Sequence, residues 1–209
     1  MKKISAILGA AAAVLLVAGC ASTGSAPKAS GGESASVPCI NNPEPKGDVM
    51  VLDSFEEGNY WQAVGDTWDQ WGSHNLSLEA DVVDDWASDG DYCAKWTFDI
   101  ATKETSCQAS SFCNALLETD WTDVKYLVLD AKVITDEPIT LKANTQNGVD
   151  WNWSSTDTVT LGIGENKNVT FDFTKHGISH AEQIACAIID VTGENNGGDI
   201  LIDNIRIVR

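Results

Sequence analysis

The stretch Gly198-Asp199-Ile200-Leu201-Ile202-Asp203-Asn204-Ile205-Arg206-Ile207-Val208-Arg209 decides the fold. It is rich in β-branched residues and stays apolar to the last residues of the chain. Such a run is typical of a strand that is paired within a sheet, at its centre or its edge. Strict alternation places Leu201, Asp203, Ile205 and Ile207 on one face, and Ile200, Ile202, Asn204 and Arg206 on the other.

The carboxylate of Asp203 interrupts one of these apolar rows. A buried carboxylate without a partner is costly, so Asp203 needs a cation or several N–H donors. A strand-edge Asp bonded to backbone or water is the plainer alternative. Asp53 and Glu56 stand at the end of a predicted first strand, and they would meet Asp203 if the first and last strands lie close together. Carboxylates gathered in this way require a cation, and oxygen ligands favour calcium.

The rest of the chain predicts an all-β domain. Short alternating segments are separated by Gly, Asn, Asp or Pro, and helix signals are few. This pattern predicts a two-sheet antiparallel β-sandwich, or jelly roll. The predicted strands cover residues 49–55, 75–80, 92–99, 124–134, 139–145, 156–161, 168–173, 183–191 and 200–208.

The N-terminus resembles a bacterial lipoprotein signal peptide. Lys2 and Lys3 precede an apolar, alanine-rich run, and Leu16-Val17-Ala18-Gly19-Cys20 matches a lipobox. This resemblance implies a leader over residues 1–20, lipidation at Cys20 and display on the cell envelope. Ala21 follows the cysteine, at the position where an Asp would signal retention in the inner membrane. The outer membrane or cell surface is therefore expected if the cell has two membranes. An ordinary secretory signal with an incidental cysteine is the alternative.

Residues 21–47 are rich in Ser, Ala, Gly and Pro, which predicts a flexible tether before a domain over residues 48–209. The formal net charge of −18 at pH 7 argues against nucleic acid as a partner, and against contact with anionic lipid surfaces beyond the lipid anchor itself. The charge is compatible with a neutral ligand or a cation.

The chain has six cysteines, and an exported protein permits disulfides. Without Cys20, an odd number remains, so not all of them can pair within one molecule. Cys107 and Cys113 are close enough in a Ser-rich segment to form a local disulfide. Cys93 and Cys186 lie in predicted strands, where they either pair with each other or are simply buried. Cys39 lies in the tether, and its role stays open.

Tryptophan is over-used, with eight in the chain. Trp151 and Trp153 flank Asn152 and share a face if the segment is extended. Indole rings stack on the C–H faces of sugars, and neighbouring polar groups bond the hydroxyls. If the strands at 124–134 and 139–145 are neighbours, they add a polar patch, whose alternative is an ordinary solvated sheet face. The candidate carbohydrate-binding residues are Trp151, Trp153, Lys142, Asn144, Gln146, Asp130 and Tyr126.

Four motifs in this order resemble the β-jelly-roll carbohydrate-binding modules of the galactose-binding-like group, of the type attached to cellulases and xylanases. They are Leu52-Asp53-Ser54-Phe55-Glu56-Glu57-Gly58, Asp89-Gly90-Asp91-Tyr92-Cys93-Ala94-Lys95-Trp96, Asp120-Trp121-Thr122-Asp123-Val124-Lys125-Tyr126-Leu127 and Ile200-Leu201-Ile202-Asp203-Asn204-Ile205. The resemblance implies glycan binding on a sheet face or at loop tips. It also implies a structural Ca²⁺ held by Glu56 and Asp203, with Asp53 a further candidate.

These features lead to three functional hypotheses. The leading one is non-catalytic binding of a polysaccharide or oligosaccharide by an envelope-anchored lipoprotein. The second is a structural or assembly lipoprotein that holds another envelope protein through the same sandwich. The third is a small glycoside hydrolase, which would need two carboxylates facing each other across a cleft. Exposed Trp151 and Trp153 beside Asn144 and Lys142 in a groove would favour the first hypothesis.

Overall fold

In the computed structural model, the C-terminal stretch forms β12 (Asn196–Val208), the central strand of a sheet. β6 (Tyr126–Thr135) pairs along one side of it. β4 (Cys93–Ile100) and then β1 (Val49–Asp53) pair along the other side. All three pairings are antiparallel, so the prediction that the C-terminus is held within a sheet is confirmed, and the first and last strands do lie side by side.

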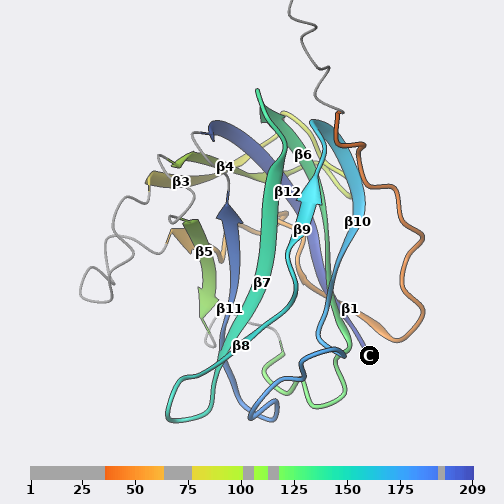
Figure 1. The fold of residues 1–209 in the computed structure, drawn as a ribbon, viewed down its shortest axis with the longest axis vertical. Coiled ribbons are helices and arrows are strands. Elements are labelled where there is room, and N and C mark those ends of the chain that lie inside the picture. Colours follow the sequence, from red (N-terminus) through yellow and green to blue (C-terminus); the bar gives the residue numbers. More distant parts are fainter. Residues whose placement is uncertain (1–35, 64–76, 101–105, 113–117, 193–195) are drawn as a thin grey trace, which may run out of the picture. The chain divides into compact units, whose positions relative to one another are not determined.

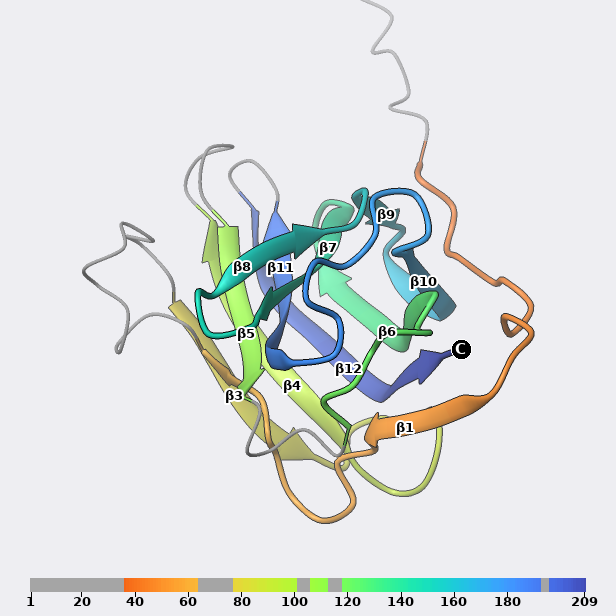
Figure 2. The same cartoon turned by 90° about the horizontal axis from the view of Figure 1, so that it is seen from below.

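Two antiparallel sheets pack face to face, which confirms the predicted sandwich (Figures 1 and 2). In the first, the β12 sheet, the order is β10-β6-β12-β4-β3, with β1 added on β12. In the second, the β7 sheet, the order is β2-β5-β11-β7-β8, with β9 added on β7. The remaining strands are β2 (Gln62–Ala63), β3 (Ser77–Val83), β5 (Ser106–Phe112), β7 (Ile139–Asn147), β8 (Asn152–Ser155), β9 (Val159–Leu161), β10 (Gly164–Asp172) and β11 (Ile184–Thr192).

The structure describes residues 36–63, 77–100, 106–112, 118–192 and 196–209, all within one compact unit that begins at Ala35. The predicted leader with Cys20 lies outside the described residues, and so does the predicted disulfide, because neither Cys113 nor the side chain of Cys107 is described. None of the described segments contains a helix of the length and hydropathy that crossing a bilayer requires.

The core lies between the sheets and follows the predicted alternation. Leu127, Leu129 and Ala131 of β6 face Ile139 and Leu141 of β7 across it, and all five side chains are buried. Of the tryptophans that the structure describes, Trp61, Trp96 and Trp121 are also buried in this core. These indoles therefore stabilise the fold and are not available to a ligand.

A bulge in β12 changes which side chains reach the core. Asn204 has a φ of 51°, and the register with β6 shifts between Asp203 and Arg206. The extra residue reverses the side-chain alternation beyond this point. The core residues are therefore Ile200, Ile202, Ile205 and Ile207, and strict alternation was wrong for half of the strand. Leu201, Asp203, Arg206 and Val208 lie on the outer face, yet they too are buried.

Residues 36–48, which we call the N-terminal strap, cover part of that outer face. The strap runs beside β10 (Figure 1), where the amide of Lys167 donates to the carbonyl of Ile40 at 2.9 Å. The buried side chain of Asn166 accepts from the amide of Ile40 at 2.8 Å. The stretch predicted as a tether is thus bonded to the domain at Ile40.

Two cysteine questions are answered by burial. Cys93 of β4 is a buried free thiol, so it does not pair with Cys186. Cys186 is buried in β11, in the other sheet, with its Sγ 3.4 Å from Oε1 of Gln146. Cys39 lies exposed in the strap, and its Sγ donates to the carbonyl of Ile163 at 3.1 Å. The burial alternative therefore holds for Cys93 and Cys186.

Candidate functional site

The outer face of the β7 sheet carries a row of polar side chains. Ile139, Leu141 and Ala143 of β7 point into the core, so the residues between them point outward. β11 and β8 lie on the two sides of this part of β7 and bring further side chains to the same face. We call the following set the polar face: Lys142, Asn144 and Gln146 of β7, Trp153 and Ser155 of β8, and Asp190 of β11.

Trp153 is the aromatic residue of the polar face. It is 48% exposed and lies opposite Gln146 in the register of β7 and β8. Its indole Nε1 donates to Oγ of Ser155 at 2.8 Å, and this Oγ donates to Oδ1 of Asn144 at 2.7 Å. Trp153 therefore lies beside Asn144 and Gln146, and Lys142 follows along β7. Of the grouping that would favour carbohydrate binding, Trp153, Asn144 and Lys142 therefore share one face.

Trp151 is also exposed, at 46%, but it is placed differently. Its φ of 55° puts it in the turn between β7 and β8, so the segment is not extended as the sequence argument assumed. The turn is held by the 179–183 loop, since the carbonyl of Ser179 accepts from Nδ2 of Asn147 and that of Gln183 from the amide of Gly148, each at 2.8 Å. Trp151 thus lies at a loop tip and Trp153 on a sheet face.

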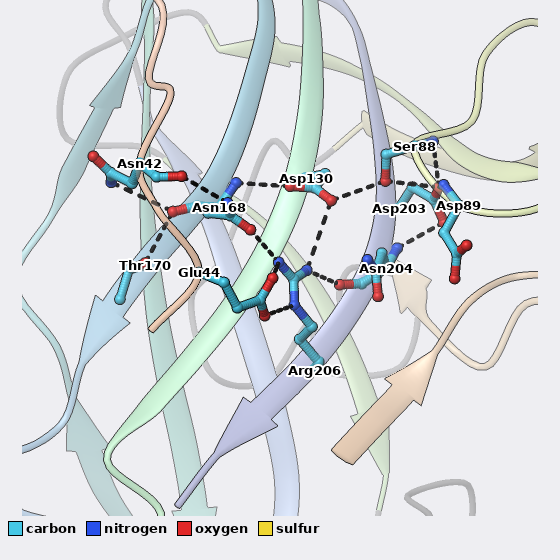
Figure 3. Close-up of polar contacts among 10 residues, drawn as sticks. All are labelled: Asn42, Glu44, Ser88, Asp89, Asp130, Asn168, Thr170, Asp203, Asn204 and Arg206. Atoms are coloured by element: carbon cyan, nitrogen blue, oxygen red, sulfur yellow. Dashed lines mark hydrogen bonds and ion pairs between the residues drawn. The ribbon is translucent and has the colours of Figure 1, made fainter. Parts of the chain in front are cut away.

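Tyr126 and Asp130 do not belong to this site. Both lie on β6, which is in the β12 sheet, so the strands at 124–134 and 139–145 are not neighbours as the prediction required. Asp130 is buried, and its Oδ1 accepts from the amide of Asn168 at 2.7 Å. Its Oδ2 accepts from Oγ of Ser88 at 2.9 Å (Figure 3). This carboxylate therefore holds chain segments together on the other side of the sandwich.

Asp203 is fully buried and bonded to N–H donors (Figure 3). Its Oδ2 accepts from the amides of Ser88 and Asp89 at 2.6 and 2.9 Å, and its Oδ1 from the amide of Asn204 at 2.6 Å. Several N–H donors can stabilise a buried carboxylate without a cation. The contacts of Asp203 thus match the plainer alternative that the sequence left open.

The other two predicted calcium ligands also accept backbone N–H groups. Oε1 of Glu56 accepts from the amides of Asp91 and Tyr92 at 2.8 and 2.9 Å. Oδ1 of Asp53 accepts from the amide of Phe55 at 2.8 Å. Burial raises the pKa of Asp53 to about 6, its N–H bonds oppose the rise, and the charge of Asp203 adds to it.

These carboxylates do not form a calcium site as they lie. Among the described residues, no group of three or more Asp, Glu, His or Cys side chains is placed to hold a metal ion. Calcium needs six to eight oxygen ligands. The loop at residues 88–92 instead presents backbone N–H groups to the carboxylates of Glu56 and Asp203. The donor set does not fit the ion, and calcium stays a prediction drawn from the resemblance.

The polar face offers no carboxylate pair from its strands. Asp190 is the only acidic residue in β7, β8, β9 and β11. Hydrolysis of a glycosidic bond by the usual route needs two carboxyl groups. Ser155 and Asp190 were not among the predicted site residues, although Ser155 stands two residues after Trp153 and thus shares its face. The predicted strand at 156–161 began too late to reveal this.

No family model matches the chain, and no curated protein matches it in sequence. Solved structures match it in fold. The family 11 carbohydrate-binding module of the cellulosomal cellulase Lic26A-Cel5E of Clostridium thermocellum superposes with a TM-score of 0.56 at 14% identity, covering 78% of this chain and 96% of that one. A module of family 28, specific for non-crystalline cellulose, gives 0.56 at 13% identity, with 83% and 100% covered.

A third match has a bound ligand. The CBM27-1 module of Caldicellulosiruptor saccharolyticus, solved in complex with mannohexaose, superposes with a TM-score of 0.52 at 16% identity, covering 77% of this chain and 97% of that one. At such identities the likeness concerns the fold alone. The chain therefore has the β-sandwich fold of carbohydrate-binding modules, as the sequence resemblance implied.

Proposed function

We propose that this protein is a non-catalytic module that binds a polysaccharide or oligosaccharide on the polar face of the β7 sheet. The observation that carries the proposal is Trp153, an aromatic ring that is half-exposed on a strand and bonded in place beside a row of amide side chains. The fold shared with carbohydrate-binding modules supports the same function.

The chemistry of the face suits a neutral sugar chain. An indole ring buries the apolar C–H side of a pyranose, and an amide group such as that of Gln146 exchanges hydrogen bonds with hydroxyls. Lys142 and Asp190 stand opposite each other in the register of β7 and β11, so the face carries both signs of charge. With a formal net charge of −18, the chain as a whole repels anionic polymers.

We further propose that lipid on Cys20 anchors the module to the cell envelope. The lipobox-like sequence ending at Cys20 supports this. Metabolic labelling with palmitate should mark the wild-type protein and not a Cys20→Ala variant. Membrane fractionation should find the wild type with the envelope, and equal solubility of the two forms would exclude the anchor.

Binding of a partner protein is the second candidate function, and the edge of β1 favours it. Among the described residues β1 pairs on one side only, with β12, and Val49 and Val51 are exposed on it. An open apolar edge can accept a strand from another chain. Val51→Lys should abolish such an interaction and leave glycan binding unchanged.

Affinity electrophoresis tests the leading proposal. Wild-type protein should be retarded in gels that contain at least one of four soluble polysaccharides: a cellulose derivative, xylan, mixed-linkage β-glucan or mannan. Trp153→Ala should lose the retardation, because stacking on an aromatic ring is the main contact proposed. Tyr126→Ala, on the other sheet, is the matched control and should bind normally. Absence of retardation on all four polymers would exclude the proposal for these ligands.

A further inference from the structure

A chain of two hydrogen bonds sets the orientation of Trp153. Indole Nε1 can only donate, so Oγ of Ser155 accepts at 2.8 Å. The Ser155 hydroxyl then has its own proton for Oδ1 of Asn144, at 2.7 Å. The direction of the first bond follows from the indole, which has no acceptor. The direction of the second follows from the placement of the Asn144 amide, whose oxygen lies toward Ser155.

The strand register builds this chain of bonds. Ser155 lies directly opposite Asn144 in the pairing of β8 and β7, and Trp153 precedes Ser155 by two residues on the same face. Asn144, which accepts the second of the two hydrogen bonds, is only 2% exposed and is therefore enclosed by the protein. Its Nδ2 has no hydrogen-bond partner among the described residues. An unsatisfied buried donor is unfavourable, so this orientation of the Asn144 amide lowers the free energy of unfolding.

We propose that Ser155 and Asn144 are positioning residues, which hold the exposed indole of Trp153 in one orientation for stacking on a sugar. This inference rests on the proposed function, and it adds how the ring that contacts the sugar is held in place. A free tryptophan side chain loses rotamer freedom when it binds a ligand, whereas a pre-oriented ring does not. Loss of the Ser155 hydroxyl should therefore weaken glycan binding about three- to tenfold, although Ser155 itself need not touch the ligand.

The first test observes the ring without any ligand. Full-chain protein is labelled with 5-fluorotryptophan, and the ¹⁹F resonance of Trp153 is assigned by its loss in Trp153→Phe. Ser155→Ala should shift and broaden that resonance toward the unfolded-chain position. Ser155→Thr keeps a hydroxyl on a β-branched side chain that suits a strand, and it should restore the wild-type signal. Thr160→Ala removes a hydroxyl elsewhere on the β7 sheet and should leave the resonance unchanged.

The second test measures affinity for whichever of the four polysaccharides retards wild type most strongly. Ser155→Ala should weaken binding in the wild-type background and have no further effect in Trp153→Phe, whose ring lacks the N–H group. A Trp153 resonance that is unchanged in Ser155→Ala, or additive losses in the double variant, would overturn the positioning role. A shifted resonance in a protein that binds none of the polymers would uphold the positioning and overturn the proposed function instead.

Discussion

Removal of the Glu44 carboxylate should detach the strap from the buried Arg206. The Arg206 side chain is 3% exposed, and its guanidinium donates to Glu44 through Nε at 2.7 Å and Nη2 at 3.2 Å (Figure 3). Its other partners are the carbonyl of Asn204, Oδ1 of Asn168 and, at 3.7 Å, Oδ2 of Asp130. Glu44 is thus closer to the buried guanidinium of Arg206 than Asp130, the other carboxylate, is.

The expected cost follows from these contacts. Hydrogen bonds to a charged group contribute about 1.5–3 kcal/mol each. The Glu44 side chain is 47% exposed, so solvent screening reduces that value. We expect Glu44→Gln to lower the free energy of unfolding by about 2 kcal/mol. Arg206→Met should cost more, about 3–5 kcal/mol, because it leaves Asp130 buried without its cation.

Urea denaturation of residues 21–209, followed by tryptophan fluorescence, measures both values. Glu57→Gln is the matched control, because Glu57 is exposed beyond the end of β1, and it should change stability by less than about 0.5 kcal/mol. In the Arg206→Met background, Glu44→Gln should lose most of its effect. A Glu44→Gln variant as stable as the Glu57→Gln control, together with an equally stable 48–209 fragment, would refute the role given to the strap.

Three further predictions concern Asp53 at the end of β1, Asp203 in β12 and Gly90 in the loop whose N–H groups bond Glu56 and Asp203. The pKa of Asp53 is raised from 3.8 to about 6, so the folded state binds its proton more tightly than the unfolded chain does, and ionisation costs stability as pH rises between these values. In a chelator, the stability of Asp53→Asn relative to wild type should therefore rise by up to about 3 kcal/mol from pH 4 to 7, and a constant difference would contradict the raised pKa. If calcium is bound, EDTA should lower the melting temperature of wild type and leave that of Asp203→Asn unchanged. The N–H contacts of Asp203 favour the other result, in which EDTA shifts the melting temperature of neither protein. Gly90→Ala would place a Cβ 2.3 Å from Oε1 of Glu56 at a φ of +75°, whereas Gly177→Ala, at +72°, meets nothing within 4 Å. By thermal denaturation, the first should destabilise the fold by about 1 kcal/mol more than the second, and equal losses would show that only backbone strain matters.

Local pattern was enough to predict most of the sandwich. β7 alternates apolar residues with polar ones, and half-burial on a two-layer sheet imposes that period, whereas β6 and β11 were predictable from their runs of apolar and β-branched residues. β5 escaped prediction because its sequence, SCQASSF, lacks such alternation and forms a strand through its pairing with β11.

The candidate site was predictable only in part. Lys142, Asn144 and Gln146 share a face because they lie at alternate positions of one strand, which the sequence shows. That Tyr126 and Asp130 belong to the other sheet depends on how the strands are ordered, and consecutive strands need not be neighbours. Ser155 acquires its partner Asn144, and Trp153 its neighbour Gln146, from the register of β8 on β7, which the sequence of either strand alone does not show.

Local pattern in the sequence predicted the fold class, the pairing of the last strand within a sheet and the need of Asp203 for partners, because apolar alternation and the cost of a buried charge are local properties. Only the tertiary structure decided what those partners are. The bulge at Asn204 reversed the faces of β12, and the loop at Ser88 and Asp89 supplied N–H donors from 114 or 115 residues away. Such long-range contacts depend on packing between elements, and packing cannot be read from the order of residues in one segment.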